Sequence, residues 1–379
     1  MTTVIKAVVA HLKDSFFIKS ETFIYNCISS FTRFKPICLA KEFNNLDYFP
    51  FPEQNRFEIV FPYSKKDRIL FVLFRRYRKI IQVLKREKAV LLHAHFGPSG
   101  VFALPFAKEL RIPLITTFYG YDISKLARDK TWLRKYKILF KQGDFFLVEG
   151  SYMKSCLVAL GCHDNKIKIQ RIAIPLEKTP FRERLPKKQE ENVIFIFAGR
   201  FVEKKGLIYA LQAFREARKE LTNFEFRIIG DGLLKSQIYD FVQANLMDSY
   251  VKFLGFLSYD EYLKEMEKAD IFIHPSVTAY DGDSEGGAPT TILEAQAMGM
   301  PIIATNHADI PNVTLPGQSA LLSEERDIVS LTQNIKQLLI SQNSWGRMGR
   351  AGRKFVEDNH DLKIEAEILE DIYDTILKS

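Results

Sequence analysis

Short apolar runs alternate with amphipathic segments along the chain, and this alternation predicts a parallel α/β fold. Six apolar runs predict strands in the first half, at residues 4–10, 57–60, 89–93, 113–117, 144–148 and 167–174. Segments of helical periodicity lie between them, at residues 21–31, from residue 101 and at residues 151–160. Because such alternation places helices on both faces of a parallel sheet, we expect one doubly wound domain here.

A second alternating series predicts a second domain of the same kind. Its expected strands lie at residues 193–198, 224–229, 251–254, 270–273 and 301–305. The segment at residues 176–191 is polar and broken by prolines, so we predict a linker there. Two helical stretches end the sequence, at about residues 344–358 and 362–377. Ligands of doubly wound sheets bind beyond the carboxyl ends of the strands, which predicts a site in a cleft between the two domains.

The composition is that of a water-soluble globular protein. Hydrophobic residues make up 46% and charged residues 26% of the 379 residues. No apolar run approaches the roughly 20 residues that a membrane span needs, and residues 1–10 lack the features of a signal peptide. We therefore expect a cytoplasmic protein whose four scattered cysteines are reduced.

Positive charge is concentrated in one segment. Residues 64–88 contain ten basic and two acidic residues, a balance that equals the net charge of +8 of the whole chain. Apolar residues recur there at helical spacing opposite the charges, which predicts an amphipathic helix with a cationic face. We interpret this helix as an attachment site for the anionic inner face of the cell membrane. The alternative is a core-facing helix with a solvated outer face. Nucleic acid is not an expected partner, because the sequence offers no base-stacking or groove-reading motif.

The stretch at residues 280–301 indicates a ligand-binding loop that leads into a short helix. Pro289 and Gly299 suit the two ends of a helix over about residues 289–298. Gly286 and Gly287 precede it and allow the backbone to approach a ligand. The free N–H groups and the positive end of the helix dipole favour an anion at this point.

Two carboxylates bracket this anion site, Glu285 in the loop and Glu294 in the helix. Carboxylates beside an anion site are better suited to hydroxyl groups, so the pair predicts a sugar that carries a phosphate. In the alternative interpretation, Glu294 is a solvated helix residue and the glycines form only a turn. The apolar neighbours of Glu294 argue against this alternative, because a carboxylate in an apolar helix needs partners.

Two cations follow the first strand of the second domain. Arg200 and Lys205 lie between that strand and the next helix, where they can hold a diphosphate by charge-assisted hydrogen bonds. Their neighbour Lys204 is a candidate for a merely solvated residue. The turn at residues 230–232 lacks a third glycine at dinucleotide spacing, and no P-loop motif occurs. A nicotinamide dehydrogenase and a P-loop kinase are therefore not expected.

Polar side chains also follow strands of the first domain. His95, Tyr119 and Asp122 are expected to face the cleft, where they can bind or deprotonate a hydroxyl group. We therefore take His95 and Asp122, together with Glu285, as candidate catalytic residues. His93, closer to its strand, is expected to be structural, and His274 is expected to be a packing or donor-pocket residue.

Two motifs together carry a resemblance to a known family. They are Gly-Arg-Phe-Val-Glu-Lys-Lys-Gly at residues 199–206 and Ser-Glu-Gly-Gly-Ala-Pro-Thr-Thr-Ile-Leu-Glu-Ala at residues 284–295. Further similar motifs lie at residues 93–97, 116–122, 253–255 and 275–276. With these motifs in this order, nearly the whole chain resembles the retaining glycosyltransferases of family 4.

The resemblance implies the GT-B fold of two Rossmann-like domains that face a cleft. Residues 1–178 would bind the acceptor and residues 190–361 the nucleotide-sugar, and the helix within residues 362–379 would cross back to the first domain. The donor would be a UDP- or GDP-sugar, with no metal and no further cofactor. Asp281 and Asp283 are accordingly interpreted as loop residues rather than as a metal site.

The resemblance also implies roles for individual residues. Arg200 and Lys205 would hold the diphosphate, Glu294 the ribose hydroxyls, and Glu285 the hydroxyls of the transferred sugar. Sugar and phosphate would be supported by the backbone of Gly286, Gly287 and Ala288. Glu285 and Glu294 have eight residues between them where the family usually has seven, which predicts an extra loop residue. Tyr119 stands where many members have a histidine, which gives His95 more weight in the acceptor site.

The sequence thus predicts a retaining glycosyltransferase that moves a sugar from a nucleoside-diphosphate-sugar onto a glycan or lipid-linked glycan of a cell-surface polysaccharide. Two alternatives stay open. One is a GT-B epimerase or phosphorylase that uses related ligands. The other is a catalytically inactive scaffold that binds a sugar nucleotide.

Overall fold

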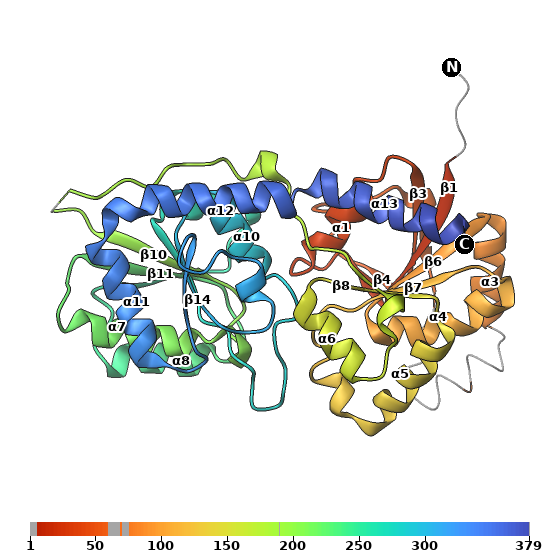
Figure 1. Ribbon diagram of the computed structural model, residues 1–379, viewed down its shortest axis with the longest axis horizontal. Helices are drawn as coiled ribbons and strands as arrows, with labels where there is room; N and C mark the ends of the chain where they lie inside the picture. The colour runs from red at the N-terminus through yellow and green to blue at the C-terminus, as the bar shows by residue number, and fades with distance from the viewer. Residues whose placement is uncertain (1–5, 60–68, 70–75, 189, 379) are drawn as a thin grey trace, which may run out of the picture. The chain divides into compact units, whose positions relative to one another are not determined.

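The computed structural model describes residues 6–59, 69, 76–188 and 190–378. The chain forms two compact α/β units, which we call unit 1 (residues 1–173 and 362–379) and unit 2 (residues 174–361) (Figure 1). The prediction of two doubly wound domains is confirmed, because each unit is built on a parallel sheet with helices between its strands.

The described residues of unit 1 form a parallel sheet of seven strands in the order β5-β3-β1-β6-β7-β8-β9. The strands are β1 (Ala7–Leu12), β3 (Phe34–Ala40), β5 (Arg56–Glu58), β6 (Ala89–His95), β7 (Leu114–Thr117), β8 (Phe145–Val148) and β9 (Ile167–Ile169). The short β2 (Ser15–Phe16) and β4 (Glu42–Phe43) pair separately. The strand order reverses between β1 and β6, so the carboxyl ends of these two strands form the switch point at which doubly wound sheets bind ligands.

Helices of the described residues cover this sheet in two groups. The helices are α1 (Thr22–Ser29), α3 (Arg76–Arg86), α4 (Gly97–Leu110), α5 (Lys130–Gln142), α6 (Ser151–Ala159) and α13 (Leu362–Lys378). Helices α3, α4 and α5 contact one another in sequence, whereas α1 packs against α13. Each group buries its own apolar cluster against the sheet.

The last helix, α13, docks on unit 1 through a buried carboxylate. Glu370 is 1% exposed and accepts the backbone N–H groups of Thr32, Arg33 and Phe34, at 3.0, 2.7 and 3.0 Å. These donors lie in the turn after α1 and at the first residue of β3. The prediction that the terminal helix returns to the first domain is therefore confirmed.

The described part of unit 2 contains a sheet of six parallel strands in the order β12-β11-β10-β13-β14-β15. The strands are β10 (Val193–Ala198), β11 (Phe224–Ile229), β12 (Val251–Gly255), β13 (Ile271–His274), β14 (Ile302–Thr305) and β15 (Ala320–Ser323). The helices are α7 (Leu207–Arg218), α8 (Lys235–Ala244), α9 (Tyr259–Lys268), α10 (Thr290–Ala297), α11 (Ile328–Ile340) and α12 (Trp345–Asn359). The order reverses between β10 and β13, so the switch point of unit 2 lies at the carboxyl ends of these strands.

The prediction of a linker at residues 176–191 is wrong, because most of this segment is tied into unit 2. The guanidinium of Arg184 is 1% exposed and donates to the carbonyl oxygens of Ala269 (2.9 Å), Met298 (2.7 Å) and Met266 (3.1 Å). A fork of five N–H donors can satisfy several carbonyls at once, which holds the polar segment against the unit. The division between the units lies earlier, between Ala173 and Ile174.

The predicted basic helix at residues 64–88 is partly described, as α3 and the turn after it, while residues 60–68 and 70–75 lie outside the described residues. In the described part, Ile80, Ile81 and Leu84 are buried in the core of unit 1. The apolar side of α3 is therefore a core face, as the alternative interpretation expected, and it is not available to insert into a lipid bilayer. Only the charged side, with Arg78 and Lys79, is exposed.

Candidate functional site

Two turns lie side by side at the switch point of unit 2. β10 leads into the 3-10 turn η5 (Glu203–Lys205), and β13 leads into the loop that precedes α10. Gly206 permits this approach: its φ angle is +65°, and an added Cβ would lie 1.8 Å from the carbonyl oxygen of Pro275. A glycine is required here, because any other side chain would meet both the strained backbone and this carbonyl.

Lys204 fixes the loop from within the protein. Its ammonium donates to the carbonyl oxygen of Ser284 at 2.9 Å and pairs with Asp283 at 3.0 Å. The side chain is 8% exposed, so the interpretation of Lys204 as a solvated neighbour is wrong. The ion pair also occupies Asp283, in line with its interpretation as a loop residue.

Glu285 and Lys205 meet at this switch point. The Lys205 ammonium lies 2.7 Å from Glu285 Oε1, and the same oxygen accepts a hydrogen bond from Ser276 Oγ at 3.0 Å. His274 Nε2 lies 3.5 Å away. Burial by itself would raise the pKa of Glu285, but Lys205 above all, with His274 and Lys204, holds that pKa well below its usual value. Glu285 is therefore a buried carboxylate that stays charged and accepts hydrogen bonds.

Unpaired backbone donors lie beside this carboxylate. Gly286, Gly287 and Ala288 are buried, and their N–H groups donate to no other described residue. Buried N–H groups are nearly always paired, so these three are suited to receive an anionic or hydroxyl-bearing ligand. Helix α10 begins one residue later than predicted, with Pro289 as its N-cap, and Gly299 follows its end with a φ angle of +82°.

Arg200 also leaves the carboxyl end of β10, ahead of η5. Its side chain is exposed and forms no ion pair with the part of the chain that the structure describes. The loop that carries it is held by the turn after β11, where an added Cβ on Gly230 would lie 1.9 Å from the carbonyl oxygen of Gly199. Those turn glycines therefore support the cation loop, a role that their spacing alone did not indicate.

Glu294 is buried on α10 and bonded to α9. Tyr262 Oη donates to one carboxylate oxygen at 2.7 Å, and Tyr259 Oη donates to the other at 3.0 Å. The side chain is 7% exposed, and burial raises its pKa from 4.5 to about 7. The alternative of a solvated residue is therefore wrong. The contacts of Glu294 lead to α9 and not to the pair of Lys205 and Glu285.

Three histidines occupy the switch point of unit 1. His11 is the last residue but one of β1, and His93 and His95 lie in the last three residues of β6, with side chains at most 3% exposed. His11 Nδ1 lies 3.1 Å from His95 Nε2, and His95 Nδ1 lies 2.6 Å from Tyr119 Oη. His93 is bonded to Tyr373 Oη of α13 at 2.6 Å, in line with its structural interpretation. His95 is the last residue of its strand and not, as expected, a residue after it. Burial lowers the pKa of all three rings, so they are neutral.

These three histidines are the described residues whose spacing fits a metal ion, but the orientations of their rings do not fit one. The rings of His93 and His95 are stacked at 4.5 Å with an interplanar angle of 20°. A metal must lie in the plane of each imidazole that binds it, and two stacked planes share no such point. Both nitrogens of His95 already take part in hydrogen bonds. The cluster is better described as a hydrogen-bonded network that orients Tyr119.

Asp122 is bonded to the backbone and has no exposed oxygen, so the prediction that it faces the cleft is wrong. The side chain is fully buried, and its oxygens accept the backbone N–H groups of Gly97 (2.8 Å), Tyr119 (3.0 Å) and Gly120 (3.1 Å). Burial raises its pKa to about 6. Asp122 joins the start of α4 to the turn after β7, and it acts on the site through the position of Tyr119.

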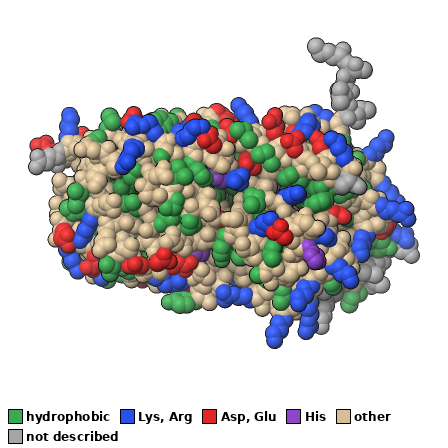
Figure 2. Space-filling model, in the orientation of Figure 1, with side chains coloured by type: hydrophobic (Ala, Val, Ile, Leu, Met, Phe, Trp, Pro, Cys, Tyr) green, Lys and Arg blue, Asp and Glu red, His purple; other side chains and the backbone are tan. Residues whose placement is uncertain are grey.

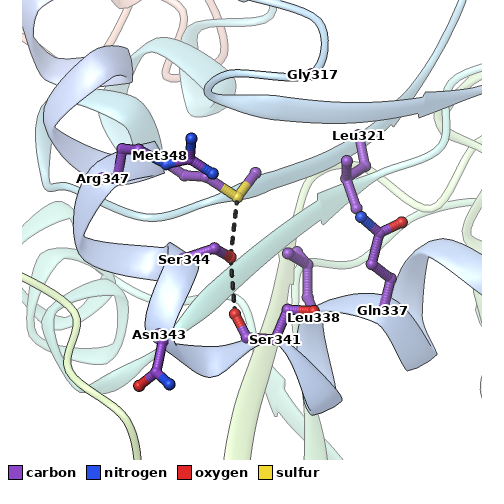
Figure 3. Close-up of a pocket in the computed structure, with 9 residues that line it drawn as sticks. All are labelled: Gly317, Leu321, Gln337, Leu338, Ser341, Asn343, Ser344, Arg347 and Met348. Carbon is purple, nitrogen blue, oxygen red and sulfur yellow. Dashed lines mark hydrogen bonds between the residues drawn. The ribbon is translucent and has the colours of Figure 1, made fainter.

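A pocket of unit 2 lies away from these residues (Figure 3). It has a volume of about 530 Å³ and is lined mainly by the end of α11 and the start of α12, with Gln337 and Met348 among its residues. Helix α11 starts after the carboxyl end of β15 and runs 13 residues, about 20 Å, toward the opposite edge of the sheet. This pocket is therefore separate from the switch point that holds Lys205 and Glu285.

Two family models match the chain, one in each half. The model of group 1 glycosyl transferases matches residues 177–355, and the model of glycosyltransferase family 4 matches residues 37–178. The amylovoran biosynthesis glycosyltransferase AmsK of Erwinia amylovora is 32% identical over 282 residues, 73% of this chain and 69% of AmsK. WcaL of Escherichia coli (strain K12), a glycosyltransferase assigned to colanic acid biosynthesis, is 32% identical over 256 residues, 67% of this chain and 62% of WcaL. The chain thus spans less than two thirds of the length of WcaL.

Solved structures share the fold over nearly the full length. Anabaena HepE, solved in complex with UDP, has a TM-score of 0.80 at 13% identity and covers 97% of this chain and 100% of its own. A glycosyltransferase from Rickettsia africae ESF-5 has a TM-score of 0.80 at 16% identity, with 99% of each chain covered. These likenesses confirm the predicted GT-B fold. Given the two family models and the identity to AmsK, the chain belongs to the group 1 glycosyltransferases of family 4.

Proposed function

We propose that the protein is a retaining glycosyltransferase that moves a sugar from a nucleoside-diphosphate-sugar to a glycan or lipid-linked glycan of a cell-surface polysaccharide. The observation that carries the proposal is the pair of Lys205 and Glu285, 2.7 Å apart beside three unpaired backbone N–H groups. Two relatives support the product class, because AmsK and WcaL are assigned to amylovoran and colanic acid biosynthesis.

The site offers one partner for each part of such a donor. Lys205 and the exposed Arg200 supply positive charge for the diphosphate, to which the N–H groups before α10 add uncharged donors. Glu285 accepts hydrogen bonds from hydroxyls of the transferred sugar, and Glu294 accepts hydrogen bonds from the ribose hydroxyls. The donor is a UDP- or GDP-sugar in this proposal, and the solved complexes of HepE with UDP and with UDP-glucose support the former.

Retention of configuration results when the acceptor attacks the same face of the sugar from which the diphosphate departs. In the proposed reaction, the bond between the anomeric carbon and the diphosphate oxygen breaks while the acceptor oxygen bonds to that carbon. The acceptor proton passes to the leaving diphosphate, so no carboxylate base of the protein is required. The burial of Asp122 supports this scheme, because its oxygens are already occupied by backbone N–H groups.

The first test is protection against thermal unfolding by a panel of UDP-, GDP- and ADP-sugars. We expect one base and one sugar to raise Tm as the ligand concentration exceeds Kd, because a ligand that binds only the folded state stabilises it by mass action. Transfer of that sugar to a glycan acceptor, with the anomeric configuration read by NMR, then completes the assignment. Protection by none of these ligands together with no transfer would refute the proposal.

Two other outcomes would identify the alternatives. Epimerisation of the free nucleotide-sugar without any acceptor would indicate a GT-B epimerase. Binding of a nucleotide-sugar with no turnover on lipid-linked or soluble glycans would indicate a scaffold.

We further propose that the protein works at the cytoplasmic face of a membrane, held there by charge. No described helix has the length and apolarity to cross a bilayer. Helix α5 contains five basic and no acidic residues, and most of these basic side chains are exposed. The helix belongs to the same layer as α3, because both contact α4. Figure 2 shows Lys and Arg side chains along the edge of unit 1 that carries α5. Each such residue near an anionic surface contributes about 1 kcal/mol.

Neutralising Arg134, Lys137 and Lys141 on α5 is therefore expected to weaken binding to vesicles of 30–40% anionic lipid by about 10-fold or more. Co-sedimentation with vesicles measures the bound fraction, and neutral vesicles serve as the lipid control.

The matched control neutralises three exposed lysines of unit 2, namely Lys219, Lys252 and Lys268, so that the net charge changes equally. Equal losses for the two triple variants, or no binding by the unaltered protein, would exclude α5 as the attachment surface.

A further inference from the structure

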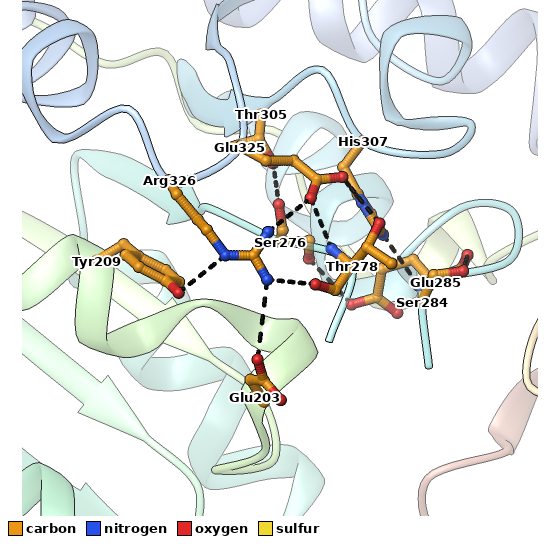
Figure 4. Close-up of polar contacts among 10 residues, drawn as sticks. All are labelled: Glu203, Tyr209, Ser276, Thr278, Ser284, Glu285, Thr305, His307, Glu325 and Arg326. Carbon is orange, nitrogen blue, oxygen red and sulfur yellow. Dashed lines mark hydrogen bonds and ion pairs between the residues drawn. The ribbon is translucent and has the colours of Figure 1, made fainter. Parts of the chain in front are cut away.

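The backbone of Glu285, and not only its carboxylate, is held by the protein. The Glu285 N–H donates to His307 Nε2 at 3.0 Å (Figure 4). His307 follows β14 and is 2% exposed, so no water competes at this bond. The sequence gives no sign of this contact, because 22 residues separate the two partners.

The direction of this bond determines the protonation of His307. A backbone N–H can only donate, so Nε2 must present its lone pair and carries no hydrogen. The proton of the neutral ring then lies on Nδ1, where it is donated to Glu325 Oε1 at 2.6 Å. An imidazolium would place one N–H group against another at 3.0 Å. The contacts therefore select the neutral Nδ1–H form of His307.

Glu325 is bonded to the same loop after β13 that contains Glu285. It accepts the backbone N–H of Thr278 at 2.8 Å and the Thr278 hydroxyl at 3.1 Å, and Arg326 Nη1 lies 3.2 Å from its second oxygen. Thr278 and Glu285 lie at opposite ends of the same loop after β13. Glu325 and His307 thus hold both ends of this loop, as Figure 4 shows.

We propose that His307 and Glu325 are positioning residues that fix the loop so that the Glu285 carboxylate points at the transferred sugar. This inference rests on the proposed function, in which Glu285 contacts that sugar. The carboxylate of Glu325 keeps the proton on Nδ1 of His307, and the free Nε2 anchors the backbone of Glu285. A carboxylate that orients a histidine in this way acts through the tautomer that it selects.

Two variants of His307 each keep one of the two hydrogen bonds that its ring makes. In His307→Gln, the amide oxygen reaches the position of Nε2 and still accepts the Glu285 N–H. In His307→Asn, the shorter amide donates to Glu325 from the position of Nδ1 and leaves the Glu285 N–H without an acceptor. We expect kcat to fall about 10-fold to 100-fold in the Asn variant and less than about 3-fold in the Gln variant, with KM for the nucleotide-sugar little changed in both. Equal kcat values for the two variants would overturn the inference.

Two measurements test the same inference without any turnover. Nitrogen-15 NMR of the unaltered protein is expected to show His307 as the neutral Nδ1–H tautomer, with its signal assigned by loss in His307→Gln. Hydrogen exchange at the Glu285 amide is expected to be at least about 10-fold faster in His307→Asn than in His307→Gln. A proton on Nε2, or equal exchange in the two variants, would refute the positioning role. If no nucleotide-sugar is bound or turned over while these two results hold, the proposed function fails and the anchoring of the loop stands.

Discussion

Replacement of Glu285 by Ala is expected to lower kcat by about 100-fold to 1,000-fold while Kd for the nucleotide-sugar changes by only a few fold. The reason is that different groups of the site bind the sugar and the diphosphate of the donor. Glu285 is a charged, buried acceptor for sugar hydroxyls, whereas the diphosphate is held by Lys205, Arg200 and backbone N–H groups that the substitution leaves in place. In the unaltered protein, the Lys205 ammonium lies 2.7 Å from the Glu285 carboxylate. Without that carboxylate, the ammonium is fully available to the diphosphate. Steady-state kinetics and a binding titration with the nucleotide-sugar in the absence of acceptor separate the two effects.

The control for this experiment is Asp281→Asn, an exposed carboxylate of the same loop, which is expected to leave kcat and Kd unchanged. Because the Ala variant leaves Lys205 buried without its partner, its unfolding midpoint is compared with that of the unaltered protein before rates are interpreted. Undiminished turnover in a folded Glu285→Ala protein would remove Glu285 from the reaction.

The parts of the fold that could be predicted are those with a continuous signal. β10 and β11 have the predicted bounds. β10 is an unbroken apolar run, which is typical of a central strand covered on both faces, and β11 alternates apolar with charged residues and ends before a glycine turn. β3 (Phe34–Ala40) was not predicted, although it pairs with β1 over six positions. Lys35 and Pro36 interrupt its apolar run, and proline is usually a signal against a strand. Tertiary pairing with β1 and β5 outweighs these local preferences.

The same distinction explains the site. Lys205 and Glu285 could be paired from the sequence, since each belongs to a glycine-containing turn after a predicted strand. His307 is not predicted, because it approaches Glu285 only through the pairing of β13 with β14. Ser276 lies in the same loop as Glu285, but the sequence does not indicate that its hydroxyl donates to that carboxylate. His11 is not predicted for the same reason as His307: it lies near the end of β1, which neighbours β6 only in the folded sheet.

Asp122 shows the converse error. Its place after a strand, beside Tyr119 and a glycine, is equally suited to a ligand-binding carboxylate and to one that binds the backbone. Only the three N–H groups around it distinguish the two roles. Sequence position indicated where the residue lies, and burial decided what it binds.

Glu294 is expected to make the stability of unit 2 depend on pH in the direction opposite to that of most carboxylates. Burial raises its pKa from 4.5 to about 7, so between these values the folded protein holds a proton that the unfolded chain has lost. The contribution of Glu294 to stability is therefore fully present below pH 4.5 and is lost as the pH rises through about 7, by about 3 kcal/mol in all. In Glu294→Gln the amide keeps the shape of the group and cannot ionise. We therefore expect the unaltered protein to lose about 2.5 kcal/mol relative to this variant between pH 5 and pH 8.

Urea unfolding at several pH values measures this difference, and the two tryptophans allow unit 2 to be followed alone. Trp345 is buried in unit 2, so its fluorescence in a Trp132→Phe background reports the unfolding of that unit. Burial raises the pKa of Glu365 to about 7 as well, but Glu365 lies in unit 1 and is present in both proteins, so its effect cancels in the comparison. A difference between the two proteins that stays constant from pH 5 to pH 8 would show that Glu294 is ionised throughout. In that case the hydrogen bonds from Tyr259 and Tyr262 would be strong enough to offset the burial of its charge.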